Sequence, residues 1–216
     1  MSGTIRSAPK GAAERPAPIV MAFTGASGAP YGVRLLGQLI AAGRDVSLIV
    51  SSHGLRLLKT ETDIGDVAGL RTAVGTTPWD KHVTVFDDAD RGAAPASGSA
   101  KSAGMVICPC SMGTLASIAA GTSRSLVERA ADVTLKERRP LVLVPRETPL
   151  SAIHLENMLR LARAGAVVLP AAPAFYHRPT TIAQLVDFVV ARVLDQLGVE
   201  QSLVPRWGAE TAADRA

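Results

Sequence analysis

The stretch Ile19-Val20-Met21-Ala22-Phe23-Thr24-Gly25-Ala26-Ser27-Gly28 decides the fold, because an unbroken apolar run passes directly into a loop of small residues. Consecutive apolar residues without alternation are typical of a strand buried on both faces of a parallel sheet. Leucines at helical spacing follow up to Ile40, and Gly43 ends that pattern. A second apolar run at 46–50 completes a β–α–β unit, which places the small-residue loop at the carboxyl end of the first strand.

The same alternation continues to the end of the folded region. Apolar runs predict further buried strands at 105–109, 141–144 and 166–169, with helices at 111–120, 125–135, 153–164 and 181–197. Residues 61–102 lack clear periodicity and predict a loop-rich excursion with one strand near 82–86. These elements predict a single α/β domain over 19–200, an open doubly wound parallel sheet of Rossmann-like or flavodoxin-like type. Residues 1–18 are expected to be a disordered extension, and residues 201–216 a tail that covers the site.

Composition excludes several function classes. Apolar residues make up 47% of the 216 residues and charged residues 19%, enough to bury a core. Half of the net charge of +4 comes from residues 1–18, and the near balance elsewhere argues against a nucleic-acid surface. No apolar run approaches the roughly 18 residues of a membrane span. Cys108 and Cys110 are too few for a disulfide framework or a zinc site, so we expect a reducing cytoplasm.

Ligands of doubly wound sheets bind beyond the carboxyl ends of the strands, so residues there are the first candidates. Two of these loops, 24–28 and 111–114, combine hydroxyls and glycine at a helix N-terminus, which suits a phosphate-bearing cofactor. A plain tight turn explains the first loop equally well, and simple N-capping by Ser111 explains the second. Arg146-Glu147 follows a buried strand, where a carboxylate is expected to be paired or reactive. Tyr176 and His177 occupy the corresponding place after the next strand.

Cations elsewhere in the chain are further candidates. Arg129 and Lys136 are seven residues apart and share one helix face, although a solvated stripe is the ordinary role of such residues. Arg192 falls inside the apolar arc of its helix beside Phe188, which predicts partial burial and an anionic partner. That partner is either Asp195 or a ligand.

Five segments resemble the UbiX-type flavin prenyltransferases, which are related to FMN-dependent cysteine decarboxylases. They are Thr24-Gly25-Ala26-Ser27-Gly28, Cys108-Pro109-Cys110-Ser111-Met112-Gly113-Thr114, Glu128-Arg129-Ala130-Ala131-Asp132, the block from Lys136-Glu137-Arg138-Arg139-Pro140 to Pro145-Arg146-Glu147, and Pro170-Ala171-Ala172-Pro173-Ala174-Phe175-Tyr176-His177. The resemblance runs from about Ile19 to Trp207.

The resemblance implies an enzyme that transfers a dimethylallyl group from dimethylallyl phosphate to reduced FMN. Flavin N5 attacks the allylic carbon as phosphate leaves, and flavin C6 then closes a fourth ring. The prenylated flavin serves a UbiD-type decarboxylase. The resemblance also implies a homo-oligomer, expected to be a dodecamer, with sites between subunits.

Site roles implied by the resemblance fall into four groups. The flavin contacts are Gly25, Ala26, Ser27, Ser51, Ser111, Met112, Gly113, Thr114 and Arg129. The phosphate-binding residues are Lys136, Arg146, Tyr176 and Arg192. Ser27 and Glu147 handle protons, with Glu61 of a neighbouring subunit closing the pocket. Trp207 is an aromatic cover of the site.

Two other functions are alternatives to a flavin prenyltransferase. An FMN-dependent decarboxylase would act directly on a carboxylate substrate, and a non-catalytic carrier would only deliver FMN. Residues 95–99 lack the asparagine found in the direct decarboxylases, which counts against the first alternative. A carrier would need no cation cluster beside the flavin, so the predicted cations count against the second.

Asp87-Asp88-Ala89-Asp90 invites comparison with magnesium-binding prenyltransferase motifs, but the neighbouring Gly92 and Arg91 favour a solvated turn. We therefore expect a reaction that needs no metal.

Overall fold

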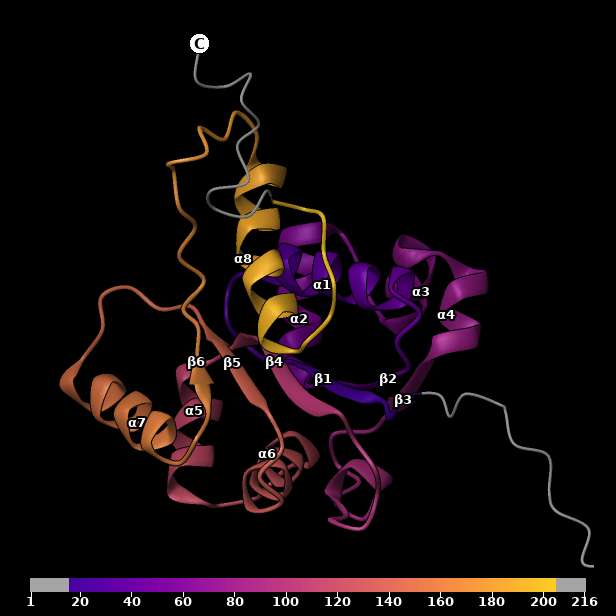
Figure 1. The fold of residues 1–216 in the computed structure, drawn as a ribbon. Helices are drawn as coiled ribbons and strands as arrows, with labels where there is room; N and C mark the ends of the chain where they lie inside the picture. Colours follow the sequence, from indigo (N-terminus) through magenta and orange to yellow (C-terminus); the bar gives the residue numbers. More distant parts are fainter. Residues whose placement is uncertain (1–15, 205–216) are drawn as a thin grey trace, which may run out of the picture.

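The computed structural model describes residues 16–204 and contains one parallel sheet, ordered β3-β2-β1-β4-β5-β6 (Figure 1). The strands are β1 (Ile19–Phe23), β2 (Val46–Val50), β3 (Val83–Phe86), β4 (Gly104–Cys110), β5 (Leu141–Pro145) and β6 (Val167–Val168). Ile19 pairs with Val46 on one side and with Gly104 on the other, so β1 lies in the middle of the sheet. The predicted doubly wound α/β fold is confirmed.

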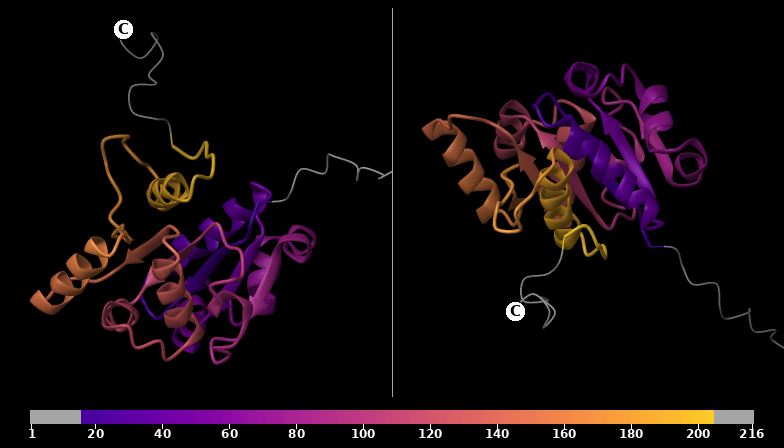
Figure 2. Two further views of the ribbon diagram at one scale, coloured as in Figure 1. Left: turned by 60° about the horizontal axis from the view of Figure 1, so that its bottom comes forward. Right: turned by 90° about the horizontal axis from the view of Figure 1, so that it is seen from above.

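Helices cover both faces of the sheet. One face carries α1 (Ala29–Ala41), α2 (Ser52–Thr62), α3 (Val67–Val74), α4 (Thr76–His82) and α8 (Ile182–Gln196), and the other carries α5 (Met112–Ala120), α6 (Leu126–Lys136) and α7 (Ala152–Arg163). Alternate residues of each strand supply the two cores: Met21 packs on the α1 and α8 side, whereas Ala22 packs on the α5 and α6 side. Figure 2 shows α1 and α8 on one side of the sheet and α7 apart from them.

The expectation of a loop-rich excursion over 61–102 is wrong in its first half. Short helices α3 and α4 occupy most of residues 67–82, and α2 precedes them. Each of the three buries a single large side chain, Leu58, Leu70 or Trp79, so apolar periodicity has too few members to be read. The predicted strand is present as β3, at the edge of the sheet.

The second half of the excursion is a set of turns held by aspartates. Asp87 accepts a hydrogen bond from the Ala89 N–H, and Asp90 accepts one from the Gly92 N–H, both at 3.0 Å. Asp88 instead reaches α6, where its carboxylate accepts from the Val127 N–H at 3.0 Å. Each carboxylate therefore serves a backbone amide, as expected of turns and helix caps.

Strand order creates a crevice between β1 and β4. The chain leaves β1 toward the α1 face and leaves β4 toward the α5 face, so the two following loops diverge. Such a switch point is where open α/β sheets bind their ligands. Within residues 16–204, no helix is long and apolar enough to cross a membrane.

Candidate active site

Thr24 joins the two loops at the crevice. Its hydroxyl donates to the Pro109 carbonyl at 2.9 Å and accepts from the Ser111 N–H at 2.8 Å. The side chain is 2% exposed, so these bonds are shielded from water. Sequence analysis placed Thr24 in a candidate loop but gave it no role, although a hydroxyl directly after a buried strand was the available signal. Its role is to fix the loop after β1 against the loop after β4.

Two glycines bring the carboxyl end of β2 against the same loop. A Cβ on Gly25 would lie 2.6 Å from the His53 Cβ, and one on Gly54 would lie 2.6 Å from the Phe23 carbonyl oxygen. Both contacts are too close for any other residue. Ser51 caps α2 through its hydroxyl, which accepts from the Gly54 N–H at 3.1 Å. The loop after β1 is thus enclosed from both sides by backbone.

Glu61 occupies the N-terminus of α1. Its carboxylate accepts hydrogen bonds from the Gly28 and Ala29 N–H groups, both at 2.8 Å. Burial raises the pKa of Glu61, but hydrogen bonds from Ser27, Gly28 and Ala29 and the charge of Arg146 outweigh burial, and the net pKa lies below its usual value. The position that the sequence suggested for a ligand anion therefore holds a carboxylate of the chain itself.

The resemblance implied that Glu61 closes the pocket of a neighbouring subunit, whereas the contacts seen here join it to the loop after β1 of its own chain. Glu61 lies on α2, which packs beside α1 in the same chain. The last turn of α2 therefore brings the carboxylate to the loop after β1 without help from another copy. Sequence analysis did not predict this contact, because the last residues of α2 fall within the segment that was expected to be a loop-rich excursion.

Arg146 and Glu147 follow β5 at the same edge. Arg146 Nε donates to the Ser27 carbonyl at 3.3 Å, so Ser27, Glu61 and Arg146 form one cluster, which we call the cradle. Glu147 is exposed, and within residues 16–204 the hydrogen bond of its carboxylate is a local one, accepted from the Thr148 N–H at 3.0 Å. The structure thus places Glu147 next to the cradle but leaves it free to turn toward a ligand.

Of the other predicted flavin contacts, Ala26 lies in the loop after β1, and Met112 and Gly113 begin α5. Ala26 and Met112 are buried, whereas Gly113 is exposed with open space around its Cα. Ser111 accepts from the Thr114 N–H at 3.2 Å and donates to the Thr114 hydroxyl at 3.0 Å, so it caps α5 as predicted.

Tyr176 and Arg192 belong to the arm formed by the loop after β6 and by α8. The Tyr176 ring meets the Phe188 ring edge-on at 5.9 Å, and Arg192 follows Phe188 by one helical turn. The prediction that Arg192 is partly buried is wrong: its side chain is 55% exposed and pairs with Asp195 at 3.0 Å. Val189 and Val193 take the buried face instead, which leaves Arg192 at the boundary of the apolar arc.

Arg129 and Lys136 lie away from the cradle. Arg129 pairs with Asp132 at 2.9 Å, and Lys136 pairs with Glu137 beside Gly98. The chain passes from Lys136 through a short turn into the start of β5, whereas Arg146 follows the end of that strand. At about 3.3 Å per residue, the five residues of β5 separate these edges by roughly 15 Å. Figure 1 shows α6 on the same face of the sheet as α5 and α7, with α1 and α8 on the other face.

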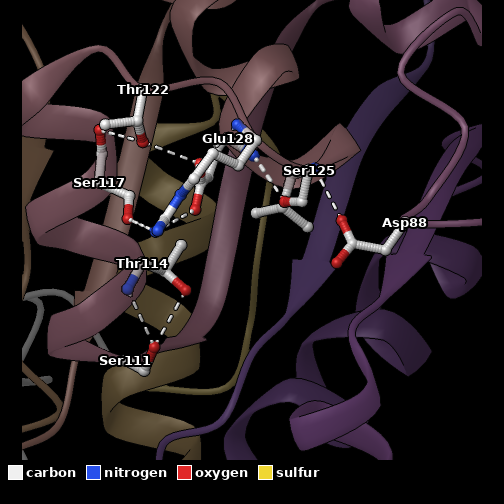
Figure 3. Close-up of polar contacts among 9 residues, drawn as sticks. Asp88, Ser111, Thr114, Ser117, Thr122, Ser125 and Glu128 are labelled. Carbon is white, nitrogen blue, oxygen red and sulfur yellow. Dashed lines mark hydrogen bonds and ion pairs between the residues drawn. The ribbon is translucent and has the colours of Figure 1, made fainter.

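A buried acid that sequence analysis missed joins α5 to α6. Glu128, 8% exposed, accepts from the Arg124 N–H at 2.7 Å and from the Thr122 hydroxyl at 3.0 Å (Figure 3). Burial raises the pKa of Glu128, but bonds from Arg124, Thr122 and Ser117 outweigh it and the net pKa is lowered. This network fixes the direction of α6, and with it the positions of Arg129 and Lys136.

Two further predictions concern residues outside this geometry. Trp207 lies outside the described residues. Cys108 and Cys110 are buried in the sheet, and burial raises the pKa of Cys110 to about 12, so these thiols are packing residues.

The fold and the crevice define a nucleotide-binding α/β protein, and comparison with known proteins specifies the class. The Flavoprotein family model matches residues 7–194. The chain belongs to this flavoprotein family and, within it, to the UbiX flavin prenyltransferases.

The assignment to the UbiX flavin prenyltransferases rests on similar proteins of that name. The chain is 52% identical over 202 residues to the flavin prenyltransferase UbiX of Pseudomonas aeruginosa, which covers 90% of this chain and 96% of that protein. It is 49% identical over 195 residues to the UbiX of Alkalihalophilus pseudofirmus, with 88% and 96% covered.

Solved structures agree. AnUbiX in complex with FMN and dimethylallyl pyrophosphate superposes with a TM-score of 0.84 at 41% identity, covering 91% of this chain and all of that one. A dodecameric FMN-dependent Ubix-like decarboxylase from Escherichia coli O157:H7 gives 0.81 at 44% identity, covering 89% and all of that chain. The FMN-dependent cysteine decarboxylase TvaF, at 19% identity and a TM-score of 0.56, shares the fold alone.

Proposed function

We propose that the protein transfers a dimethylallyl group from dimethylallyl phosphate to reduced FMN. The observation that carries this proposal is the cradle: Ser27, Glu61 and Arg146 meet at the switch point of a chain half identical to a flavin prenyltransferase. In the balanced reaction, the allylic C–O bond and the alkene π bond break, and bonds to flavin N5 and C6 form. N5 and C6 each lose a proton, the alkene takes up one, and phosphate leaves with the other.

FMN fits the crevice because the residues there offer hydroxyls, backbone amides and close backbone approach. Gly25 to Ser27, Ser51 and the 111–114 loop would hold the flavin, and reduced FMN would supply the electron-rich ring. Thr24 keeps the two loops at a fixed separation, since it bonds both. The likeness to AnUbiX, whose structure contains FMN, supports this placement.

We assign phosphate binding to Arg146, Tyr176, Arg192 and Lys136. Fixed cations stabilise the negative charge that develops on phosphate as the allylic bond breaks. Arg192 must exchange Asp195 for the phosphate, which its exposed position permits. Lys136 lies at the opposite edge of its own sheet, so we infer that it serves the cradle of another copy. Arg129, on the same helix, would reach the flavin of that copy.

A homo-oligomer follows from this arrangement, and we propose a dodecamer like the Escherichia coli relative. Glu147 and Ser27 would handle the protons that leave and enter the flavin, because Glu147 has only a local bond to give up. Glu61 holds the Ser27 loop and is not itself expected to exchange a proton, since its hydrogen bonds favour the ionised form. We also propose a cytoplasmic location and a UbiD-type decarboxylase as the recipient of the product.

Mass spectrometry of the flavin tests the proposal. Reduced FMN and dimethylallyl phosphate are incubated with the protein under anaerobic conditions, and a parallel reaction receives the pyrophosphate. A gain of one C5 unit with the monophosphate is expected. Unmodified flavin with both donors would contradict the proposal, and release of carbon dioxide from an added carboxylate would favour a direct decarboxylase instead. Activation of a UbiD-type apo-decarboxylase by the product tests the recipient.

A further inference from the structure

The ring nitrogens of His177 are buried in an unusual way for polar atoms. Both are shielded from solvent, and neither has a hydrogen-bond partner among the described residues. Buried polar atoms are almost always paired, and an unpaired one lowers stability. Neither nitrogen makes a hydrogen bond that would stabilise the described fold, so the stabilising contacts of the side chain come from its ring.

The face of the ring supplies that reason. His177 stacks on Phe188 with centroids 5.5 Å apart and planes inclined by 7°. Tyr176 meets both rings edge-on, at 5.6 Å from His177 and 5.9 Å from Phe188. Offset stacks and edge-to-face contacts are the two favourable geometries of aromatic pairs. The three rings form an aromatic clamp between the loop after β6 and α8.

The clamp lies where two proposed phosphate ligands meet. Tyr176 is one of its rings, and Arg192 follows Phe188 by one turn of α8. Tyr176 is 59% exposed, so the clamp holds its ring without burying it. The loop that carries Tyr176 spans residues 169–181 between β6 and α8, and such a length orders poorly without side-chain anchors.

We propose that His177 is a positioning residue for the phosphate ligands, acting through its ring face on Phe188. The stack holds the Tyr176 loop on α8 beside the turn that carries Arg192, so both side chains are in place before the prenyl phosphate binds. The proposal rests on the proposed function, because it names the residue that sets the phosphate pocket of that same site.

Two variants of similar size separate the ring face from the nitrogens. His177→Phe keeps a flat ring and removes both unpaired nitrogens, whereas His177→Leu keeps bulk but loses the plane. In His177→Leu, the KM for dimethylallyl phosphate and its dissociation constant with the FMN-loaded protein are expected to rise about 3- to 10-fold, as for a lost aromatic pair. Affinity for FMN alone and kcat should stay within about 2-fold. His177→Phe should match wild type in all four values and unfold at a higher temperature.

Each outcome decides the proposal. A phosphate affinity in His177→Phe as weak as in His177→Leu would show that the nitrogens act, and would overturn the stacking role. Unchanged phosphate affinity in His177→Leu, or equal weakening of FMN and phosphate, would overturn positioning altogether. Wild-type protein that binds FMN but forms no prenylated flavin would instead overturn the proposed function. Thermal unfolding in the order Phe above wild type above Leu supports the clamp independently of activity.

Discussion

The cradle and the outer face of α6 both carry cations and carboxylates. At the cradle these side chains come from separate elements of the fold, whereas on α6 they come from neighbouring positions of the chain. At the cradle, residues from the loops after β1 and β5 and from α2 converge: Glu61 and Arg146 both bond to the loop that carries Ser27. On α6, Arg129 and Lys136 are partly exposed, and within residues 16–204 their ion pairs are local, with Asp132 three residues on and with Glu137. The contacts of the cradle form within one subunit, whereas the cations of α6 are available to a ligand or to another copy.

The difference separates what a single chain can build from what an assembly must supply. Roughly 15 Å of strand lies between the two regions, a distance that no lysine side chain spans. The buried Glu128 network holds α6 rigidly, so a large rearrangement within the subunit would break several bonds. A site that uses both regions therefore needs two copies, and oligomer symmetry repeats such a site at every interface of that type.

Glu147→Gln gives the largest expected effect and tests the cradle side of the comparison. The amide keeps the shape of the side chain but cannot exchange a proton, so turnover should fall about 10²- to 10⁴-fold. FMN binding, followed by flavin absorbance, should be unchanged. Turnover within a few-fold of wild type would remove Glu147 from proton transfer.

Arg192→Ala has a smaller effect and tests the arm formed by the loop after β6 and by α8. Loss of a charged phosphate ligand should weaken dimethylallyl phosphate binding by tens-fold, on the order of one charge-assisted hydrogen bond. FMN affinity should change little. Asp195→Asn serves as the control, because it releases Arg192 and should not weaken phosphate. If both ligands weaken equally in Arg192→Ala, the Asp195 ion pair is structural and Arg192 has no ligand role.

Glu61→Gln tests whether the cradle is held by charge. The lowered pKa of Glu61 means that the ionised carboxylate stabilises the folded state above the ordinary carboxyl pKa, near 4.5, and that this stabilisation is lost as pH falls through the lower folded pKa. At pH 7 the variant should be less stable by about 1 kcal/mol, as for a lost helix-terminal anion. The difference should shrink as the pH falls below 4.5 toward the lower folded pKa. Denaturant unfolding at pH 7 and pH 3 measures both, and an equal difference at both values would contradict the role of charge.

Metal removal has the smallest expected effect. Excess EDTA should leave prenylation unchanged, because the proposed cations supply the fixed positive charge that magnesium would otherwise provide. Asp87→Asn and Asp88→Asn should also be active, since asparagine still accepts the backbone hydrogen bonds seen at both positions. Asp88→Ala is the control and should lower stability, because the Val127 N–H loses its acceptor. Activity lost in EDTA and restored by magnesium would contradict the metal-free reaction.

Sequence predicted the fold well wherever apolar patterns are strong. The continuous runs of β1, β4 and β5 are buried on both faces, so each residue carries the same signal. The short α3 and α4 were missed because a helix with a single buried residue has no periodicity to detect. Their stop and start signals, such as the Asp66 cap, indicate helix ends but not what lies between them.

The site was predicted unevenly for a related reason. Loops at strand ends follow from topology, so Ser27, Ser111 and Arg146 could be located from the order of strands and helices alone. Glu61 could not, because its contact with Gly28 joins two helices across 33 residues and depends on how α2 packs. The exposure of Arg192 was also beyond the sequence, since a helical wheel cannot say where the buried arc ends. Lys136 required the three-dimensional arrangement, which places it at the far edge of the sheet.

Subunit complementation tests most directly whether the cradle of one copy uses α6 of another. Lys136→Ala and Arg146→Ala are each expected to be nearly inactive, and they are then coexpressed so that mixed oligomers form. If a site takes Arg146 from one subunit and Lys136 from its neighbour, random mixing restores about one quarter of the sites. Prenylation of reduced FMN at about a quarter of the wild-type rate is therefore predicted. Mixed oligomers no more active than either parent would contradict the shared site.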